Sequence, residues 1–236
     1  MKTIIITGCS GSIGSYLVEY FSNRKYKIIG IDKVKPKKKN FEFYKIDIKN
    51  EKKLNNFYKK IKKKYKHVDV LINSAGYIHN ELFVSFSKEI RIHNFQNWKK
   101  IIENNLNLTF LNSSIYVKNF LGNYSKEKLI INFSSVNSEG VIGQSAYSSA
   151  KAAVETLTKV MSMELATFNF RVACVSPGYI KAKSTLQNVT KKKLESIVQS
   201  IPLKKLGSLG DIANGLEFII KSKYFNGKIL KIDGGK

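Results

Sequence analysis

The chain has 236 residues, which is enough for one well-packed α/β domain and too few for two full domains. Apolar residues make up 43% of it, a share that argues against disorder, and no apolar run approaches the ~18–20 residues that span a bilayer. The formal net charge of +24 comes almost entirely from lysines spread along the chain, which favours a solvated surface. Nucleic-acid sites prefer arginine, so we expect no specific nucleic-acid binding, and an acidic partner is the alternative.

Short apolar segments alternate with longer amphipathic ones along the whole chain. The pattern predicts strands over residues 3–7, 27–31, 41–46, 68–73, 128–133, 170–176 and 227–232. It predicts helices over residues 12–23, 51–65, 97–120, 146–168 and 211–221. Residues 77–96 are expected to form a long aromatic loop, and a lysine-rich mobile segment is expected to run to about residue 200.

Strands separated by helices in this rhythm are typical of parallel βαβ units. Continuous apolar strands such as Ile4-Ile5-Ile6 fit a sheet that is covered on both faces. The sequence therefore predicts one Rossmann-type doubly wound α/β domain over residues 1–236, with a seven-stranded parallel sheet in the order 3-2-1-4-5-6-7. Its ligand crevice would lie beyond the carboxyl ends of the strands, with a substrate loop at about 181–206.

A glycine-rich turn leaves the first strand and opens the first helix. Gly8 permits the tight turn, Gly11 lets the backbone approach a pyrophosphate, and Gly14 lets the helix pack closely on the strand. The helix N-terminus would then hold the pyrophosphate through free N–H groups. Asp32 follows the second strand, where a carboxylate reaches the adenosine ribose and repels a 2′-phosphate, so NAD(H) is favoured and NADP(H) stays possible.

The remaining motifs resemble those of the short-chain dehydrogenase/reductase family, and the similarity runs nearly end to end. They are the turn at 7–14, Asn73-Ser74-Ala75-Gly76, Asn105-Leu106, Ser134-Ser135, Tyr147 with Lys151, Ser176-Pro177-Gly178-Tyr179-Ile180 and Asp233-Gly234-Gly235. Tyr-x-x-x-Lys alone carries little information here, because five of the twelve tyrosines have a lysine four residues on. Only Tyr147 also begins a predicted helix and has Ser135 twelve residues before it.

The resemblance implies an NAD(P)-dependent oxidoreductase that interconverts a secondary alcohol and a ketone. Tyr147 would be the acid/base, with its pKa lowered by the Lys151 ammonium, and Ser135 would bind the substrate oxygen; alternation along the strand favours Ser135 over Ser134. Asn105 either positions a water for proton relay or only bends its helix. The resemblance and the turn together suggest these cofactor-binding residues: Gly8, Ser10, Gly11, Ser12, Ile13, Gly14, Asp32, Asp47, Ile48, Asn73, Ala75, Gly76, Tyr147, Lys151, Pro177, Gly178 and Ile180.

Two substrate classes compete within this family. Residues 201–207 resemble those of 3-oxoacyl-carrier-protein reductases, and the lysine surplus suits an acidic carrier, although Phe168 replaces a basic residue of that subgroup. The spacing Gly8-x-x-Gly11-x-x-Gly14 instead resembles the branch that modifies sugar nucleotides, which favours a keto-sugar of surface polysaccharide synthesis. Two further classes are an epimerase or dehydratase that retains NAD and a non-catalytic NAD-sensing protein.

The other expectations concern partners and location. Cys9 and Cys174 lie on strands with two others between them, ~14 Å apart at ~4.8 Å per strand, so we expect reduced thiols in a cytoplasmic protein. No metal site is expected, because His79 and His93 lack a partner cluster. The resemblance implies a homodimer or homotetramer that pairs through the helices at 97–120 and 146–168, and a small-molecule or acyl-thioester substrate. No membrane association is expected.

Overall fold

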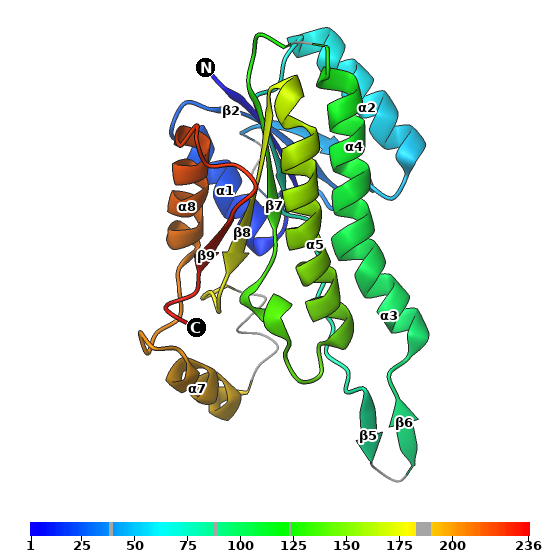
Figure 1. The fold of residues 1–236 in the computed structure, drawn as a ribbon, viewed down its shortest axis with the longest axis vertical. Helices are drawn as coiled ribbons and strands as arrows, with labels where there is room; N and C mark the ends of the chain where they lie inside the picture. Colours follow the sequence, from blue (N-terminus) through cyan, green and yellow to red (C-terminus); the bar gives the residue numbers. More distant parts are fainter. Residues whose placement is uncertain (38–39, 87–88, 123, 183–189) are drawn as a thin grey trace.

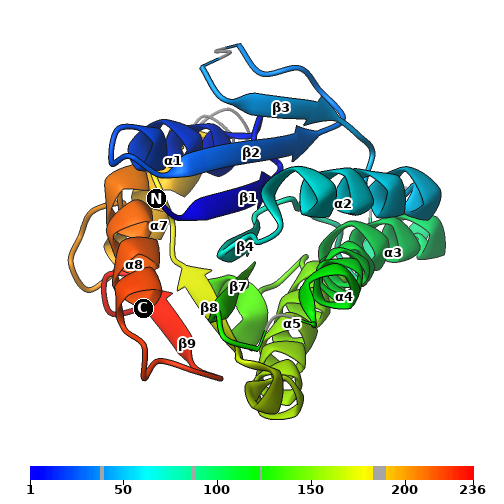
Figure 2. The same cartoon turned by 90° about the horizontal axis from the view of Figure 1, so that it is seen from above.

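The computed structural model describes residues 1–37, 40–86, 89–122, 124–182 and 190–236. Within these residues, seven parallel strands form one twisted sheet (Figures 1 and 2). In sheet order they are β3 (Glu42–Lys45), β2 (Lys27–Asp32), β1 (Thr3–Thr7), β4 (Val70–Asn73), β7 (Lys128–Phe133), β8 (Phe170–Pro177) and β9 (Ile229–Ile232). This is the predicted order, with the sequence-predicted strands five to seven corresponding to β7, β8 and β9.

Helices cover both faces of the sheet, as Figure 2 shows from above. Helices α1 (Ser12–Ser22) and α8 (Leu209–Lys221) pack on one face, and α2 (Glu51–Tyr65), α4 (Leu108–Phe120) and α5 (Ser145–Glu164) pack on the other. Strand β1 shows why: Ile4 and Ile6 join the core beside α1 and α8, while Ile5 joins the core beside α2 and α4. Its continuous apolar run is therefore buried on both sides.

The helix predicted over residues 97–120 is interrupted. It consists of α3 (Phe95–Ile102), a π-helical turn at Glu103–Asn107 and then α4. It also begins earlier than expected, because the Asn94 side chain accepts hydrogen bonds from the N–H groups of Gln96 and Asn97 and caps α3. π-Helical turns inside α-helices occur frequently at functional sites.

Two segments that were expected to lack regular structure contain elements. Residues 77–96 include an antiparallel hairpin of β5 (Val84–Phe86) and β6 (Ile90–Ile92), which projects from the lower end of the molecule (Figure 1). We predicted a mobile segment up to about residue 200, and this is wrong for residues 191–200, which form helix α7 (Lys191–Ser200) with Thr190 as its N-cap. Residues 183–189 lie outside the described residues. Among the described helices, none is long and apolar enough to span a membrane.

Candidate active site

The glycine turn between β1 and α1 has room for nothing larger than glycine at its two ends. Gly8 has a φ of +67°, and a Cβ atom there would lie 2.8 Å from the Cα of Ala75. A Cβ atom on Gly14 would lie 2.1 Å from the carbonyl oxygen of Gly8. Gly11 is the N-cap of α1 and has no side chain with which to cap the first N–H groups, so these stay available to an anion at the positive end of the helix.

Asp32, at the end of β2, faces this turn. Its two carboxylate oxygens accept hydrogen bonds of 3.0 Å from the N–H groups of Ser10 and Val34. These bonds fix the carboxylate beside the turn, where the ribose of a dinucleotide is expected. Charge-assisted bonds to backbone N–H groups still leave a carboxylate with free acceptor positions, so Asp32 can also bind a hydroxyl group.

A cleft of about 450 Å³ opens at the carboxyl ends of β1, β2 and β4. Seven of the predicted cofactor-binding residues line it: Gly8, Gly11, Asp32, Asp47, Ile48, Ala75 and Gly76. Lys33, which the sequence places beside Asp32, lines the cleft as well. Sequence reasoning missed several other lining residues, among them Lys49, Lys100 and Asn104. Lys49 adjoins the predicted Ile48, so the sequence could have indicated it, whereas Lys100 and Asn104 come from α3 and the π turn and reach the cleft only through the tertiary fold.

Ser135 and Tyr147 meet at the end of β7. Tyr147 is half-buried in the first turn of α5; burial raises the pKa of its phenol, and a hydrogen bond with Ser135 acts in the opposite direction. The adjacent Ser134 is engaged elsewhere, because its hydroxyl donates to Glu155 at 2.6 Å and lies 3.2 Å from the Lys151 carbonyl oxygen. The structure therefore brings Ser135, not Ser134, to Tyr147.

Lys151 is almost completely buried beside this pair. Its Nζ atom lies 5.6 Å from the centroid of the Tyr147 ring and donates a hydrogen bond of 2.8 Å to the carbonyl oxygen of Phe133. Burial lowers the pKa of Lys151 to about 8. We predicted that this ammonium lowers the pKa of Tyr147. That prediction is wrong for the protein without cofactor, because burial of the phenol raises its pKa and is the largest effect.

Asn105 lies in the π turn, and its side chain binds backbone groups. The Nδ2 atom donates to the carbonyl oxygens of Tyr77 and Ile101, at 2.7 and 2.9 Å, and Oδ1 accepts from the Tyr77 N–H. This geometry matches the helix-bending alternative, while the proton-relay role stays a prediction. Gly76 packs close by: a Cβ there would lie 2.9 Å from Asn105 Oδ1 and 3.8 Å from Lys151 Nζ.

Other predicted cofactor residues do not line the cleft. Asn73 is buried, and its amide bonds to three side chains of the core: Asn112, Ser113 and Asn132. Ile180 is also buried, in a bridge to Gly207. The other predicted residues that do not themselves line the cleft are Ser10, Ser12, Ile13, Gly14, Tyr147, Lys151, Pro177 and Gly178. Asn73 thus holds β4 to its neighbours, which is a structural task.

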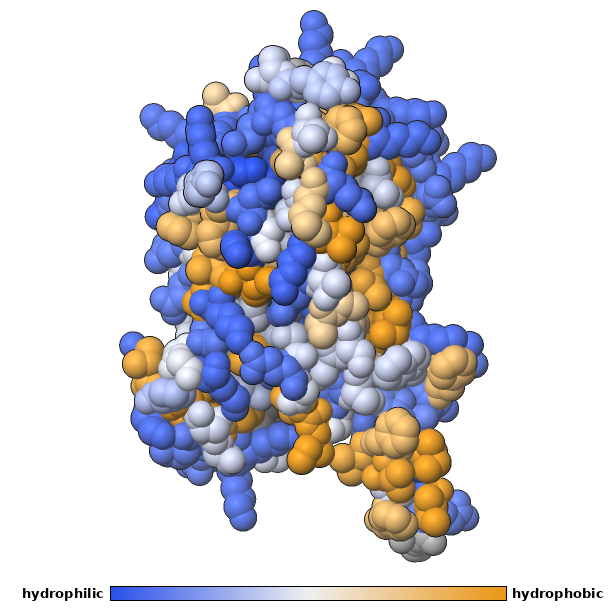
Figure 3. Space-filling view, viewed as in Figure 1, coloured by the Kyte–Doolittle hydropathy of each residue, from blue (hydrophilic) through white to orange (hydrophobic). Residues whose placement is uncertain are grey.

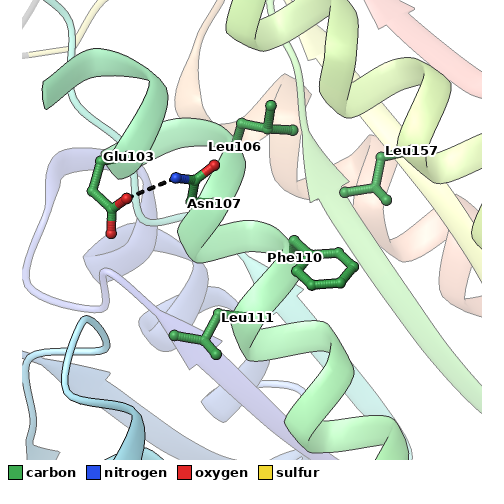
Figure 4. A pocket seen from close by; sticks show the side chains of 6 residues that line it. All are labelled: Glu103, Leu106, Asn107, Phe110, Leu111 and Leu157. Atoms are coloured by element: carbon green, nitrogen blue, oxygen red, sulfur yellow. Dashed lines mark hydrogen bonds between the residues drawn. The ribbon is translucent and has the colours of Figure 1, made fainter. Parts of the chain in front are cut away.

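A second, apolar depression of about 480 Å³ lies away from this chemistry, on the outer side of α4 (Figure 4). Its wall is formed by Leu106, Phe110 and Leu111, with Leu157 of α5 opposite. At its edge the Asn107 amide donates to the Glu103 carboxylate at 2.7 Å. The residues that line this depression include no tyrosine, serine or lysine, so it lacks the groups that meet at Tyr147.

Comparison with known proteins agrees with this architecture. The 3-oxoacyl-[acyl-carrier-protein] reductase of Rickettsia typhi is 32% identical over 99% of this chain and 96% of its own length. A short chain dehydrogenase of Leptospira borgpetersenii, solved with bound NAD+, superposes with a TM-score of 0.88 at 28% identity and covers 99% of this chain and 92% of its own. ElxO with NADP bound has the same score and identity, covering 99% and 98%.

A family model described as short chain dehydrogenase matches residues 2–193, which include the glycine turn, Ser135, Tyr147 and Lys151. The match covers more than half of the chain. The matched residues include most of the Rossmann-type sheet and the serine, the tyrosine and the lysine that lie together at one edge of that sheet. With the full-length relatives beside it, this protein belongs to the short-chain dehydrogenase/reductase family of oxidoreductases.

Proposed function

We propose that this chain interconverts a secondary alcohol and a ketone, with Tyr147 as the acid/base. The observation that carries the proposal is the hydrogen bond between Tyr147 and Ser135 beside the buried ammonium of Lys151. A phenol, a hydroxyl and a cation at one sheet edge are the groups that a carbonyl reduction requires.

Each residue has a distinct task in this proposal. Ser135 donates a hydrogen bond to the ketone oxygen and orients it toward Tyr147. As hydride reaches the carbonyl carbon, the Tyr147 hydroxyl gives its proton to the oxygen, and the alcohol forms with a phenolate left on the enzyme. The Lys151 ammonium stabilises that phenolate, because an opposite charge nearby favours the ionised form. The nicotinamide supplies the hydride when it is bound, and in the oxidised state its positive charge favours the phenolate as well.

The cofactor proposed is NAD(H) in preference to NADP(H). The glycine turn supports a pyrophosphate site, because Gly11 at the N-cap of α1 leaves the first N–H groups of the helix without a side-chain partner. The fixed Asp32 carboxylate supports a ribose with free hydroxyls and opposes a 2′-phosphate. Lys33 beside it offsets part of that repulsion, which leaves NADP(H) as the minor cofactor.

The substrate proposed first is a 3-oxoacyl group on an acidic carrier. It is supported by the curated 3-oxoacyl-carrier-protein reductase that matches over 99% of this chain, and by a net charge of +24 that would attract an acidic partner. The substrate loop is proposed at about 181–206, which includes α7 and the segment outside the described residues.

A polar group near Ser135 favours a second candidate, a keto-sugar. The Asn137 amide donates to Gln144 at 2.9 Å, its Oδ1 atom is buried without a partner among the described residues, and the Tyr179 hydroxyl bonds with the same amide. A buried acceptor left unpaired costs about 1–3 kcal/mol. A substrate hydroxyl that reached Asn137 Oδ1, by displacing the side chains that cover it, would recover this energy. An acyl chain offers no such donor.

A homo-oligomer is proposed as in the family, with pairing through α4 and α5. The apolar depression beside Phe110 and Leu157 supports this surface, because Phe110 is exposed on the outer side of α4 (Figure 4). Such a depression on a helix face is typical of helix-to-helix packing between subunits.

One assay tests the proposed reaction. Purified protein is mixed with NADH or NADPH and either an acetoacetyl thioester or a panel of keto-sugars, and nicotinamide absorbance is followed. Net oxidation with one class supports the proposal and selects the substrate. Product formation without net oxidation would instead indicate an epimerase or dehydratase that retains NAD. Dinucleotide binding with no turnover on any substrate would favour the NAD-sensing alternative.

A further inference from the structure

The β5–β6 hairpin has one wholly apolar face. Its pairs are Val84 with Ile92, Ser85 with Arg91 and Phe86 with Ile90. Because side chains alternate between the two faces of a strand, the first and last pairs lie together and Ser85 and Arg91 lie opposite. The hairpin is therefore amphipathic, although it projects from the body of the molecule (Figure 1).

Nothing in the described part of the chain covers the apolar face. Phe86 is 80% exposed, Ile90 67% and Ile92 61%. Figure 3 shows this end of the molecule as a hydrophobic cluster, on a face that carries both hydrophilic residues and other hydrophobic areas. A two-stranded hairpin is marginally stable by itself, so a projecting one needs a partner surface.

The base of the hairpin is fixed to the start of α5. The Glu81 N–H donates to the Gly143 carbonyl oxygen at 2.8 Å, and His93 Nδ1 and Ser145 Oγ are 3.1 Å apart. The Glu81 carboxylate also accepts from the Asn94 N–H and from the Asn97 amide, at 3.0 and 2.9 Å. The hairpin is thus held at a set angle, as a docking element requires.

We propose that the β5–β6 hairpin is a self-association arm, whose apolar face packs on the same face of a second copy of this chain. The area suits this partner: the side chains of Val84, Phe86, Ile90 and Ile92 offer on the order of 400 Å² of apolar surface, about half of the ~800 Å² per partner in a standard interface. A patch of this size is comparable with the largest apolar patch on a typical monomer, and such patches are often functional.

Charge also favours a second copy. The chain carries +24, so most of its surface repels another copy, but residues 81–95 are neutral: Lys88 and Arg91 balance Glu81 and Glu89. This segment is where two copies can approach at the lowest electrostatic cost. A bilayer is disfavoured, because Glu89 is exposed where the hairpin turns and would enter the membrane with the apolar side chains.

Cysteine crosslinking tests the arm directly. The native Cys9 and Cys174 are fully buried, and burial raises the pKa of both thiols to about 12, so they give little background reaction. Phe86→Cys and Ile92→Cys place a thiol at either end of the apolar face, and Ser85→Cys places one on the opposite face. A short bismaleimide should join two copies of the first two variants and not of the control. Equal crosslinking in all three, or none, would overturn the proposal.

Mass measurements across a dilution series provide a second readout. For the association step that the arm makes, apart from any pairing through α4 and α5, Phe86→Asp should raise the concentration of half-association at least about tenfold, because pairing would bury its charge, while Ser85→Asp should change it less than about twofold. If Phe86→Asp leaves the mass distribution unchanged but reduces sedimentation with phosphatidylglycerol vesicles, the face is a membrane surface. If it only raises the KM of a thioester substrate, the face binds substrate. Either result would refute the self-association arm.

Discussion

The Nζ atom of Lys151 donates a 2.8 Å hydrogen bond to the carbonyl oxygen of Phe133, and this bond ties α5 to the end of β7. Phe133 stands two residues before Ser135, and Lys151 stands one helical turn after Tyr147. The contact therefore holds together the two elements that carry the candidate acid/base and its hydroxyl partner.

Replacing Tyr147 with phenylalanine removes only the hydroxyl that would give its proton. We expect turnover to fall by ~10²–10⁴-fold, as for loss of a general acid, with dinucleotide affinity changed little. Steady-state kinetics and titration of NADH fluorescence measure the two effects separately. Near-normal turnover in this variant would contradict the assignment of Tyr147.

Ketone reduction should weaken as the pH rises through about 8, where the buried Lys151 loses its proton. Neutral lysine no longer stabilises the Tyr147 phenolate, so kcat should fall on the alkaline side. Lys151→Arg keeps its charge at every accessible pH, so the fall of kcat on the alkaline side should be absent in this variant. Circular dichroism checks that the variant is folded. A wild-type profile that stays flat up to about pH 10 would exclude the role, because the lysine would then titrate near its ordinary pKa of 10.5.

The same group has the opposite effect on stability. Its folded pKa of about 8 lies below the ordinary value of 10.5, so between these pH values the unfolded chain binds a proton that the folded chain has released. The contribution of Lys151 to the free energy of unfolding should therefore rise with pH across this window. Denaturant melts of wild-type protein and Lys151→Met between pH 8 and 10.5 isolate this contribution. The free energy of unfolding of the wild type minus that of the variant should increase with pH.

The two neighbouring serines should separate stability from turnover. Ser134→Ala removes a buried hydrogen bond to Glu155 and should lower the free energy of unfolding by about 1–3 kcal/mol while turnover stays within a few-fold. Ser135→Ala should do the reverse, with turnover reduced about 10²-fold and stability changed by less than about 1 kcal/mol. Urea melts and kinetics of both variants check this, and the opposite pattern would assign the substrate contact to Ser134.

Asp32→Asn removes the charge and keeps an acceptor for only one of the Ser10 and Val34 N–H groups, because these two groups bond to different carboxylate oxygens. We expect the ratio of kcat/KM for NADH to that for NADPH to fall at least about tenfold, because the repulsion of a 2′-phosphate is gone. The ratio is measured with one saturating ketone and both cofactors. An unchanged ratio would show that Asp32 does not lie beside the ribose.

A methyl group at Gly14 should disturb the turn itself. Its Cβ atom would lie 2.1 Å from the Gly8 carbonyl oxygen, so Gly14→Ala should cost about 1–3 kcal/mol of stability and weaken dinucleotide binding. Gly122→Ala is the matched control, since nothing lies within 4 Å of a Cβ atom there. Equal stability of the two variants in urea melts would mean that the turn can relax.

The sequence by itself determined the alternation of strands and helices and the glycine turn. These features depend on short-range patterns: runs such as Ile4-Ile5-Ile6 need cover on both faces, and Gly8 and Gly14 follow from local backbone geometry. The order of the strands was predicted from the doubly wound fold type that this alternation indicates. The order of the family motifs was also enough to pair Ser135 with Tyr147.

Only the tertiary structure decided what surrounds those residues. The pKa of Lys151, the bonding of Asn73 to Asn112 and Asn132, and the π turn at Asn105 all depend on segments that are distant in sequence. The hairpin escaped prediction because strands of three residues carry too short an alternation to read. Burial and pairing are properties of the packed chain, so periodicity within one segment cannot specify them.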